Sequence, residues 1–142
     1  MVQFEYNKSI QEFTTFGVPV EADVFCRFAS TEELQTILGE KKYHNSQKLI
    51  LGGGSNMLFT KNFDGIVLKN EIKGIEIVSE SEEELFIRVG AGENWHQFVL
   101  YCVDHNWGGV ENLSLIPGNV GASPMQNIGA YGVEIKDVFH SL

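Results

Sequence analysis

The stretch from Ile116 to Gly132 reads IPGNVGASPMQNIGAYG and carries most of the information about the fold. It contains four glycines and two prolines among small and amide residues, so it is poor at packing a core. Apolar residues still recur at Ile116, Val120, Met125 and Ile128, so we expect the stretch to pack inward rather than form a surface Ω-loop. A long loop of this kind inside a compact domain is typical of a binding site, and it suits backbone contact with a flat, polar ligand.

A second glycine-rich loop, Gly52-Gly53-Gly54-Ser55-Asn56, follows the apolar run Lys48–Leu51, which predicts a buried strand. Glycines allow close approach of a ligand, successive N–H groups can cradle a phosphate, and Ser55 and Asn56 add side-chain donors. The spacing is not the G-x-G-x-x-G fingerprint, since Met57 stands at the last glycine position, and no Gly-Lys-Ser/Thr follows as in a P-loop. Taken alone, this loop somewhat favours a plain strand-to-strand turn.

The first 70 or so residues indicate strand, helix, strand and strand in turn. Met1 to Val20 is expected to be irregular, with a turn at Gly17. The predicted strands are Ala22 to Ala29, Lys48 to Leu51 and Gly65 to Leu68. The predicted helix starts at Ser30, which forms a capping box with Glu33, and stops at Gly39; its apolar spacing comes from Leu34, Ile37 and Leu38.

The second half predicts a hairpin, a helix and a loop-rich end. The hairpin joins Ile75–Val78 to Leu85–Val89 through an acidic, solvated tip, which is not a metal site because adjacent strand residues face opposite ways. One apolar helix face is predicted from the spacing of Trp95, Phe98, Val99, Cys102 and Val103, with Gly108-Gly109 ending the helix. Val133 to Phe139 indicates the start of a further strand.

Composition excludes several function classes. The formal net charge is -9, which repels nucleic acid and anionic membranes, so an anionic ligand would depend on local backbone dipoles. No apolar run is long enough for a transmembrane helix and no secretion signal is present, so we expect a cytoplasmic protein with Cys26 and Cys102 as buried free thiols.

The remaining catalytic signals are weak. His44, His96, His105 and His140 lack metal-ligand spacing, so we predict no metal site, and no Gly-x-Ser-x-Gly elbow occurs. His96 lies beside the apolar helix face and is expected to be structural or exposed.

Four motifs together resemble one family. Thr15-Phe16-Gly17, the loop from Leu51 to Asn56, the segment from Gly90 to Trp95 and the stretch from Ile116 to Gly132 resemble the UDP-N-acetylenolpyruvoylglucosamine reductases, flavoenzymes that make UDP-N-acetylmuramate for bacterial peptidoglycan. The motifs occur in the family's order over nearly the whole chain, and the Thr-Phe-Gly form is similar to the family's longer subclass.

The resemblance implies an α+β fold of the vanillyl-alcohol oxidase/p-cresol methylhydroxylase type, with FAD held between two lobes. A small β-α-β-β lobe would span residues 1–70, and a second, incomplete lobe with an antiparallel sheet would span residues 71–142. The implied FAD contacts are Gly52, Gly53, Gly54, Ser55, Asn56, Ile116, Pro117, Gly118, Gly121, Ala122, Ser123, Asn127, Ile128 and Gly129. Ser123 is the implied polar contact, and Tyr131 would face the substrate side.

The implied activity is NADPH-dependent reduction of a UDP-sugar. In the family, NADPH reduces FAD, and the flavin delivers hydride to the enolpyruvyl double bond. The family's arginine lies in a Tyr-Arg-x-Ser segment downstream of the Ala-Tyr-Gly motif. Its serine proton donor and glutamate lie later still, in a separate substrate domain, so no catalytic residue can be assigned in this chain. We therefore expect a truncated chain that is inactive alone, binds FAD weakly or not at all when isolated, and self-associates through an open sheet edge.

Two alternatives stay open. The chain could be a catalytically inactive remnant or a non-enzymatic folded domain. It could also be a different flavin oxidoreductase of the same fold, although the run from Asn127 to Gly132 argues against this, and no His or Cys is obviously placed for covalent flavin attachment.

Overall fold

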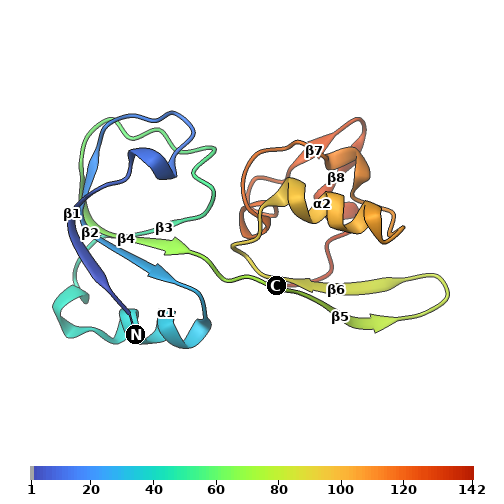
Figure 1. Ribbon diagram of the computed structural model, residues 1–142, viewed down its shortest axis with the longest axis horizontal. Helices are drawn as coiled ribbons and strands as arrows, with labels where there is room; N and C mark the ends of the chain where they lie inside the picture. Colours follow the sequence, from blue (N-terminus) through green and yellow to red (C-terminus); the bar gives the residue numbers. More distant parts are fainter. Residues whose placement is uncertain (1) are drawn as a thin grey trace. The chain divides into compact units, whose positions relative to one another are not determined.

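The computed structural model describes residues 2–142. The chain divides into two compact units with bounds Met1–Ile72 and Lys73–Leu142 (Figure 1). Each unit has its own core, so each is described by itself. The boundary lies near the one expected at residue 70, and the assignment of the units as cofactor-binding lobes stays a prediction. The elements are a mixture of short helices and mostly antiparallel or mixed sheets, which confirms the α+β class.

The first unit is built on a four-stranded sheet in the order β1-β2-β4-β3. The strands are β1 (Phe4–Ser9), β2 (Glu21–Phe28), β3 (Lys48–Leu51) and β4 (Phe63–Asn70). β1 runs antiparallel to β2, whereas β2 and β3 both run parallel to β4.

Strand β1 corrects the expectation of an irregular N-terminus. Its residues pair with β2 from Phe4 opposite Cys26 to Ser9 opposite Glu21. Asn7 has a φ of 49°, in the left-handed region, and the pairing skips it. In the sequence, the apolar–polar alternation that marks a strand stops after Tyr6, because Lys8 stands where an apolar residue would continue it, so the pattern does not reveal β1.

Helix α1 (Thr31–Gly39) begins as expected. The Ser30 hydroxyl accepts from the Glu33 N–H at 3.2 Å, while the Glu33 carboxylate accepts from the Ala29 N–H at 2.9 Å, one residue before the usual return bond. Ile37 is buried, but Leu38 is exposed, so its assignment to the apolar face is wrong. The helix ends after Gly39, because Glu40 is extended, and a separate 3-10 turn, η2 (Lys41–Tyr43), follows.

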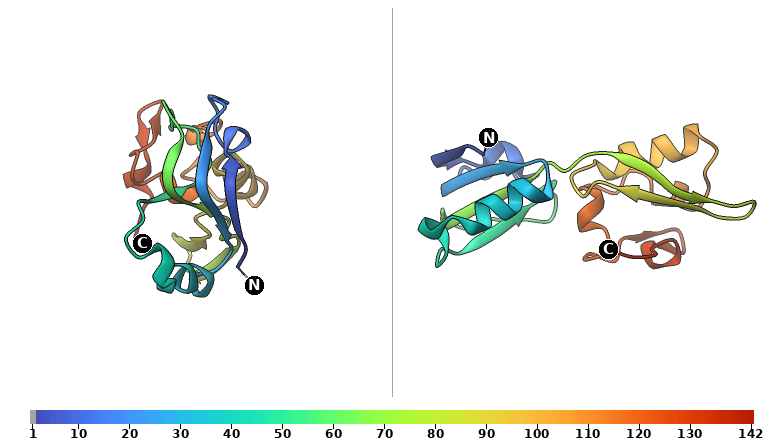
Figure 2. Two further views of the ribbon diagram at one scale, coloured as in Figure 1. Left: turned by 90° about the vertical axis from the view of Figure 1, so that its left-hand side faces the viewer. Right: turned by 90° about the horizontal axis from the view of Figure 1, so that it is seen from below.

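Apolar side chains pack on both faces of this sheet. α1 lies across one face (Figure 2), where the buried cluster consists of Val24, Cys26, Phe28, Ile37, Tyr43, Ile66 and Leu68. The other cluster consists of Ile10, Val20, Ala22, Phe25, Leu51 and Val67, next to the 3-10 turn η1 (Gln11–Phe13). Burial of both faces explains the continuous apolar runs in β2 and β4.

The second unit packs a hairpin and a helix over a loop-rich C-terminal half. β5 (Ile75–Glu80) pairs antiparallel with β6 (Leu85–Val89), and their acidic tip is exposed as expected. The Asn94 side chain caps α2 (Trp95–Asp104) by accepting from the Gln97 N–H at 3.0 Å. The buried cluster is Trp95, Phe98, Val99, Cys102, Val110, Leu113, Ile128 and Ile135. Val103 is exposed, so its place on the apolar face is wrong.

Short elements complete the second unit. They are η3 (Glu111–Leu113), η4 (Val120–Ala122), β7 (Gly129–Ala130), β8 (Val133–Glu134) and η5 (Ile135–Asp137). The predicted strand from Val133 to Phe139 is wrong beyond Glu134. The carboxylate of Asp137 accepts from the Glu134 N–H at 2.9 Å, and this reciprocal cap turns the chain into η5.

Both cysteines are free and buried, as expected. Within residues 2–142, no helix is long and apolar enough to cross a membrane.

Candidate functional site

The loop Gly52–Asn56 leaves β3 at the carboxyl end of the parallel strands of the first unit. Its backbone is held against the N-terminal segment, because the Thr15 N–H donates to the Gly54 carbonyl at 3.1 Å. Gly54 has a φ of 64°, and a Cβ there would lie 2.0 Å from the Phe13 carbonyl oxygen. Only glycine fits, so the Thr-Phe-Gly motif and the glycine-rich loop are the two sides of one backbone contact.

This loop offers donors and positive charge to a ligand. Within the described residues, the N–H groups of Gly53 and Gly54 donate to no protein acceptor. The ammonium group of Lys69, from the end of β4, donates to the Gly52 carbonyl at 2.6 Å and so places a cation beside the loop. Unpaired N–H groups next to a cation form the kind of concavity that binds a phosphate.

The second loop is anchored along the segment from Ala91 to His96. The Trp95 N–H donates to Gly118 O at 3.0 Å, and Gly121 N–H donates to Ala91 O at 3.0 Å. Two further hydrogen bonds lie between these. The Val120 N–H donates to the Glu93 carbonyl at 2.9 Å, and the Asn119 side-chain amide donates to the Gly92 carbonyl at 3.1 Å. The Gly90–Trp95 motif is therefore the anchor of the second loop.

Close approach explains one glycine of that loop. A Cβ on Gly121 would lie 2.6 Å from the Cβ of Ala91. The two backbones are therefore so close that Ala91 leaves no room for a side chain at position 121. Gly118, by contrast, has a φ of 118°, and its N–H and that of Asn119 donate to no acceptor within residues 2–142. These two groups are available to a ligand.

Ser123 lies deeper than its predicted role suggests. It is buried, and its hydroxyl donates to the Val120 carbonyl at 2.7 Å, so only its lone pairs remain for another group. Its carbonyl accepts from the N–H of buried Ile128 at 3.2 Å. The polar contact of Ser123 with a cofactor stays a prediction.

The expectation that the apolar residues of this loop pack inward is right for Ile128 and wrong for Met125. Ile128 is buried, Ile116 and Val120 are half-buried against the core, and the Met125 side chain is 92% exposed. Pro124 and the tight turn at Asn127, whose φ is 41°, carry Met125 outward.

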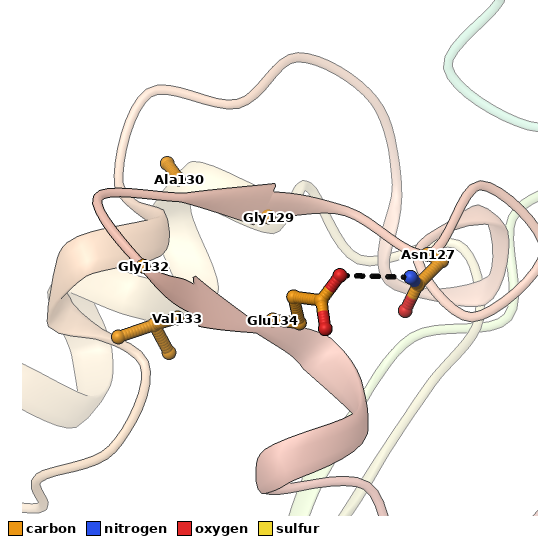
Figure 3. Close-up of a pocket in the computed structure, with 6 residues that line it drawn as sticks. All are labelled: Asn127, Gly129, Ala130, Gly132, Val133 and Glu134. Carbon is orange, nitrogen blue, oxygen red and sulfur yellow. Dashed lines mark hydrogen bonds between the residues drawn. The ribbon is translucent and has the colours of Figure 1, made fainter.

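The hairpin β7–β8 forms a shallow hollow (Figure 3). The hollow is lined by Asn127, Gly129, Ala130, Gly132, Val133 and Glu134. The Asn127 side chain donates to the Glu134 carboxylate at 3.3 Å across it. Of the predicted cofactor contacts, only Asn127 and Gly129 line this hollow. Tyr131 stands at the hairpin tip with a φ of 54° and is 88% exposed.

Apart from the terminal Leu142, the most exposed large apolar side chains are Met125, Tyr131, Leu115, Leu58 and Phe16. Met125 and Tyr131 lie in the second loop and Leu115 directly precedes it. In the first unit, Leu58 lies two residues after the loop Gly52–Asn56, and Phe16 follows Thr15, which bonds to that loop. Sequence reasoning missed Leu58, Leu115 and Lys69, because single residues beside a motif carry no periodic signal.

Neither metal binding nor a reactive thiol is supported. The described residues contain no group of three or more His, Cys, Asp or Glu that could hold a metal ion. Burial raises the pKa of both Cys26 and Cys102 to about 11, so neither thiol is poised as a nucleophile.

Known proteins resemble the chain over nearly its whole length. It is 51% identical over 140 residues to the UDP-N-acetylenolpyruvoylglucosamine reductase of Flavobacterium johnsoniae and 51% identical over 134 residues to that of Bacteroides fragilis. These matches cover 99% and 94% of this chain but only 41% and 40% of those proteins. The chain thus spans about two fifths of the curated relatives it matches.

A solved structure shares the fold. The crystal structure of UDP-N-acetylenolpyruvylglucosamine reductase from Thermus caldophilus superposes with a TM-score of 0.67 at 24% identity, covering 96% of this chain and 46% of that chain. Residues 22–142 match the family described as FAD binding domain. The glycine-rich loops, their unpaired N–H groups and this match lead to one conclusion: the chain belongs to the FAD binding domain family.

Proposed function

We propose that this chain is the FAD-binding portion of a UDP-N-acetylenolpyruvoylglucosamine reductase. The sequence identity to two such reductases supports the reaction class. The observation that carries the proposal is the loop Gly52–Asn56, which is locked by Gly54 and presents unpaired N–H groups beside Lys69. This donor set fits the pyrophosphate of FAD, which in an acidic protein must be held by local dipoles and a local cation.

The two loops have different proposed roles. The N–H groups of Gly53 and Gly54, with Ser55, Asn56 and Lys69, bind the pyrophosphate. The N–H groups of Gly118 and Asn119 and the backbone of Ile116–Pro117, Gly121–Ser123 and Asn127–Gly129 bind the rest of the cofactor. Leu115 and Met125 cover its apolar parts, while Tyr131 faces the substrate side.

The bound flavin supplies hydride transfer, with NADPH as donor and the UDP-sugar as acceptor. The residues of this chain bind and orient the cofactor, and none of them is proposed as the proton donor. We place the reaction in the cytoplasmic branch of peptidoglycan synthesis. The residues that complete the catalytic site are proposed to belong to a substrate domain outside this chain.

Titration of the purified chain with FAD, followed by quenching of flavin fluorescence, tests the proposal. Saturable but weak binding is expected, and riboflavin, which lacks the pyrophosphate, should bind more weakly than FAD. Lys69→Gln should weaken FAD binding about tenfold, since one favourable charge contact is removed next to the pyrophosphate. Lys41→Gln removes an equal charge from an exposed site in the same unit and should leave FAD affinity unchanged.

Two outcomes contradict parts of the proposal. No fluorescence change and no shift of the thermal midpoint with FAD would favour a folded domain without cofactor function. Tight, stoichiometric binding by a monomer would contradict the expected weak binding and the proposed self-association through an open sheet edge. Sedimentation velocity at several chain concentrations measures that self-association directly.

A further inference from the structure

Leu115 has an unusual backbone conformation at the entrance to the second loop. Its φ is 63°, in the left-handed region, and its side chain is 76% exposed. A left-handed conformation is unfavourable for a non-glycine residue, because its Cβ lies too close to the following carbonyl oxygen. Burial of the leucine side chain cannot compensate for this cost, since the side chain faces solvent, so another contact must hold the backbone.

The imidazole of His96 makes that contact. Its Nδ1 lies 3.3 Å from the Leu115 backbone nitrogen and 3.1 Å from the Ser114 hydroxyl. A backbone N–H can only donate, so Nδ1 must be the acceptor, and the ring is the neutral form protonated on Nε2. The Ser114 hydroxyl therefore also donates to Nδ1.

Hydrogen bonds to Trp95 hold the chain on either side of Leu115. Upstream, the Trp95 indole N–H donates to the Leu113 carbonyl at 2.7 Å. Downstream, the Trp95 backbone N–H donates to the Gly118 carbonyl at 3.0 Å. Between these anchors, Pro117 has a fixed φ, and Ile116, as the residue before proline, is confined to extended conformations.

We propose that His96 is a positioning residue for the cofactor: by accepting from Ser114 and Leu115, it keeps Leu115 left-handed and thereby directs the Gly118 N–H group toward the ligand. The inference rests on the proposed FAD function of the loop. His96 itself does not touch the cofactor. Without the His96 acceptor, Leu115 relaxes to a negative φ and the segment up to Gly118 changes direction.

The first test needs no cofactor. In the apo chain, His96→Ala should speed hydrogen exchange of the Leu115 amide about tenfold, and His96→Asn, whose side-chain oxygen can replace Nδ1, should restore slow exchange. Nitrogen chemical shifts of the His96 ring should show the form protonated on Nε2. An unchanged exchange rate in His96→Ala, or a ring protonated on Nδ1, overturns the proposal even if the chain binds no FAD.

The second test separates positioning from general stability. His96→Ala should weaken FAD binding about tenfold, whereas His96→Ala combined with Leu115→Gly should regain most of the affinity, because glycine adopts positive φ without cost. A purely structural histidine would lower the thermal midpoint, and Leu115→Gly would not rescue FAD affinity. If the unmodified chain binds no FAD, the proposed function fails for this chain, while the exchange experiment still decides the role of His96.

Discussion

The two glycine-rich loops hold their backbones in different ways. The loop Gly52–Asn56 depends on steric exclusion, since Gly54 lies so close to the Phe13 carbonyl that no side chain fits there. The loop from Ile116 to Gly129 is held mainly by attachment, through hydrogen bonds to the segment from Ala91 to His96. A loop held by exclusion should tolerate no substitution at its contact, whereas a loop held by attachment should respond to changes in its anchor.

Gly54→Ala should have the largest effect. Its Cβ would meet the Phe13 carbonyl at 2.0 Å, and its φ of 64° adds strain, so we expect a loss of roughly 3 kcal/mol or more in the stability of the first unit. Urea unfolding followed by far-UV circular dichroism measures this loss, and FAD binding should disappear with it.

Gly17→Ala and Gly39→Ala are the matched controls. Gly17 has nearly the same φ, 60°, but open space around its Cβ position, so it should lose only about 1 kcal/mol. Gly39 is helical and has open space, so alanine should stabilise the unit slightly. Equal losses at Gly54 and Gly17 would show that backbone strain, not exclusion, controls the first loop.

Gly121→Ala tests the one contact of the second loop that also depends on exclusion. The added Cβ would lie 2.6 Å from the Cβ of Ala91, and we expect a loss of about 2 kcal/mol in the second unit. Combining it with Ala91→Gly should restore part of the stability in urea unfolding, because one of the colliding methyl groups is removed. Failure of the double variant to recover would place the collision on the Ala91 backbone, whose Cα and carbonyl oxygen would each lie 3.1 Å from the added Cβ.

Removing the two helix N-caps compares the units directly. Ser30→Ala and Asn94→Ala each remove the side chain that accepts a hydrogen bond from the third helical residue, so each should cost about 1 kcal/mol. Only Asn94→Ala should also weaken FAD binding, because the start of α2 is bonded to Gly118. Isothermal titration with FAD at matched fractions of folded protein checks this, and equal affinities in the two variants would argue against attachment.

Ionisation of the two cysteine thiols should have the smallest effect on stability near neutral pH. Burial raises the pKa of Cys26 and of Cys102 from 9.0 to about 11, so the unfolded state ionises its thiols first. The associated stability is fully present below pH 9 and is lost as the pH rises toward 11. At pH 8 both thiols should resist Ellman's reagent until the chain unfolds, and rapid labelling of one of them would identify a unit that opens locally.

Several features of the fold could be predicted from the sequence because their causes are local. Ser30 and Glu33 form a cap three residues apart, and Trp95, Phe98, Val99 and Cys102 share one helix face. Two errors have local causes: Lys8 ends the apolar–polar alternation of β1 after Tyr6, and the cap between Glu134 and Asp137 ends β8 after two residues.

The sequence by itself determined the four motifs, their order and hence the family, together with the cap at Ser30 and the apolar face of the helix that contains Trp95 and Phe98. Only the tertiary structure decided why Gly54 and Gly121 must be glycine and which residues anchor the second loop. The physical reason is that capping and periodicity involve neighbours in the chain. Exclusion by Phe13 and attachment to His96 arise only when distant segments meet in the folded unit.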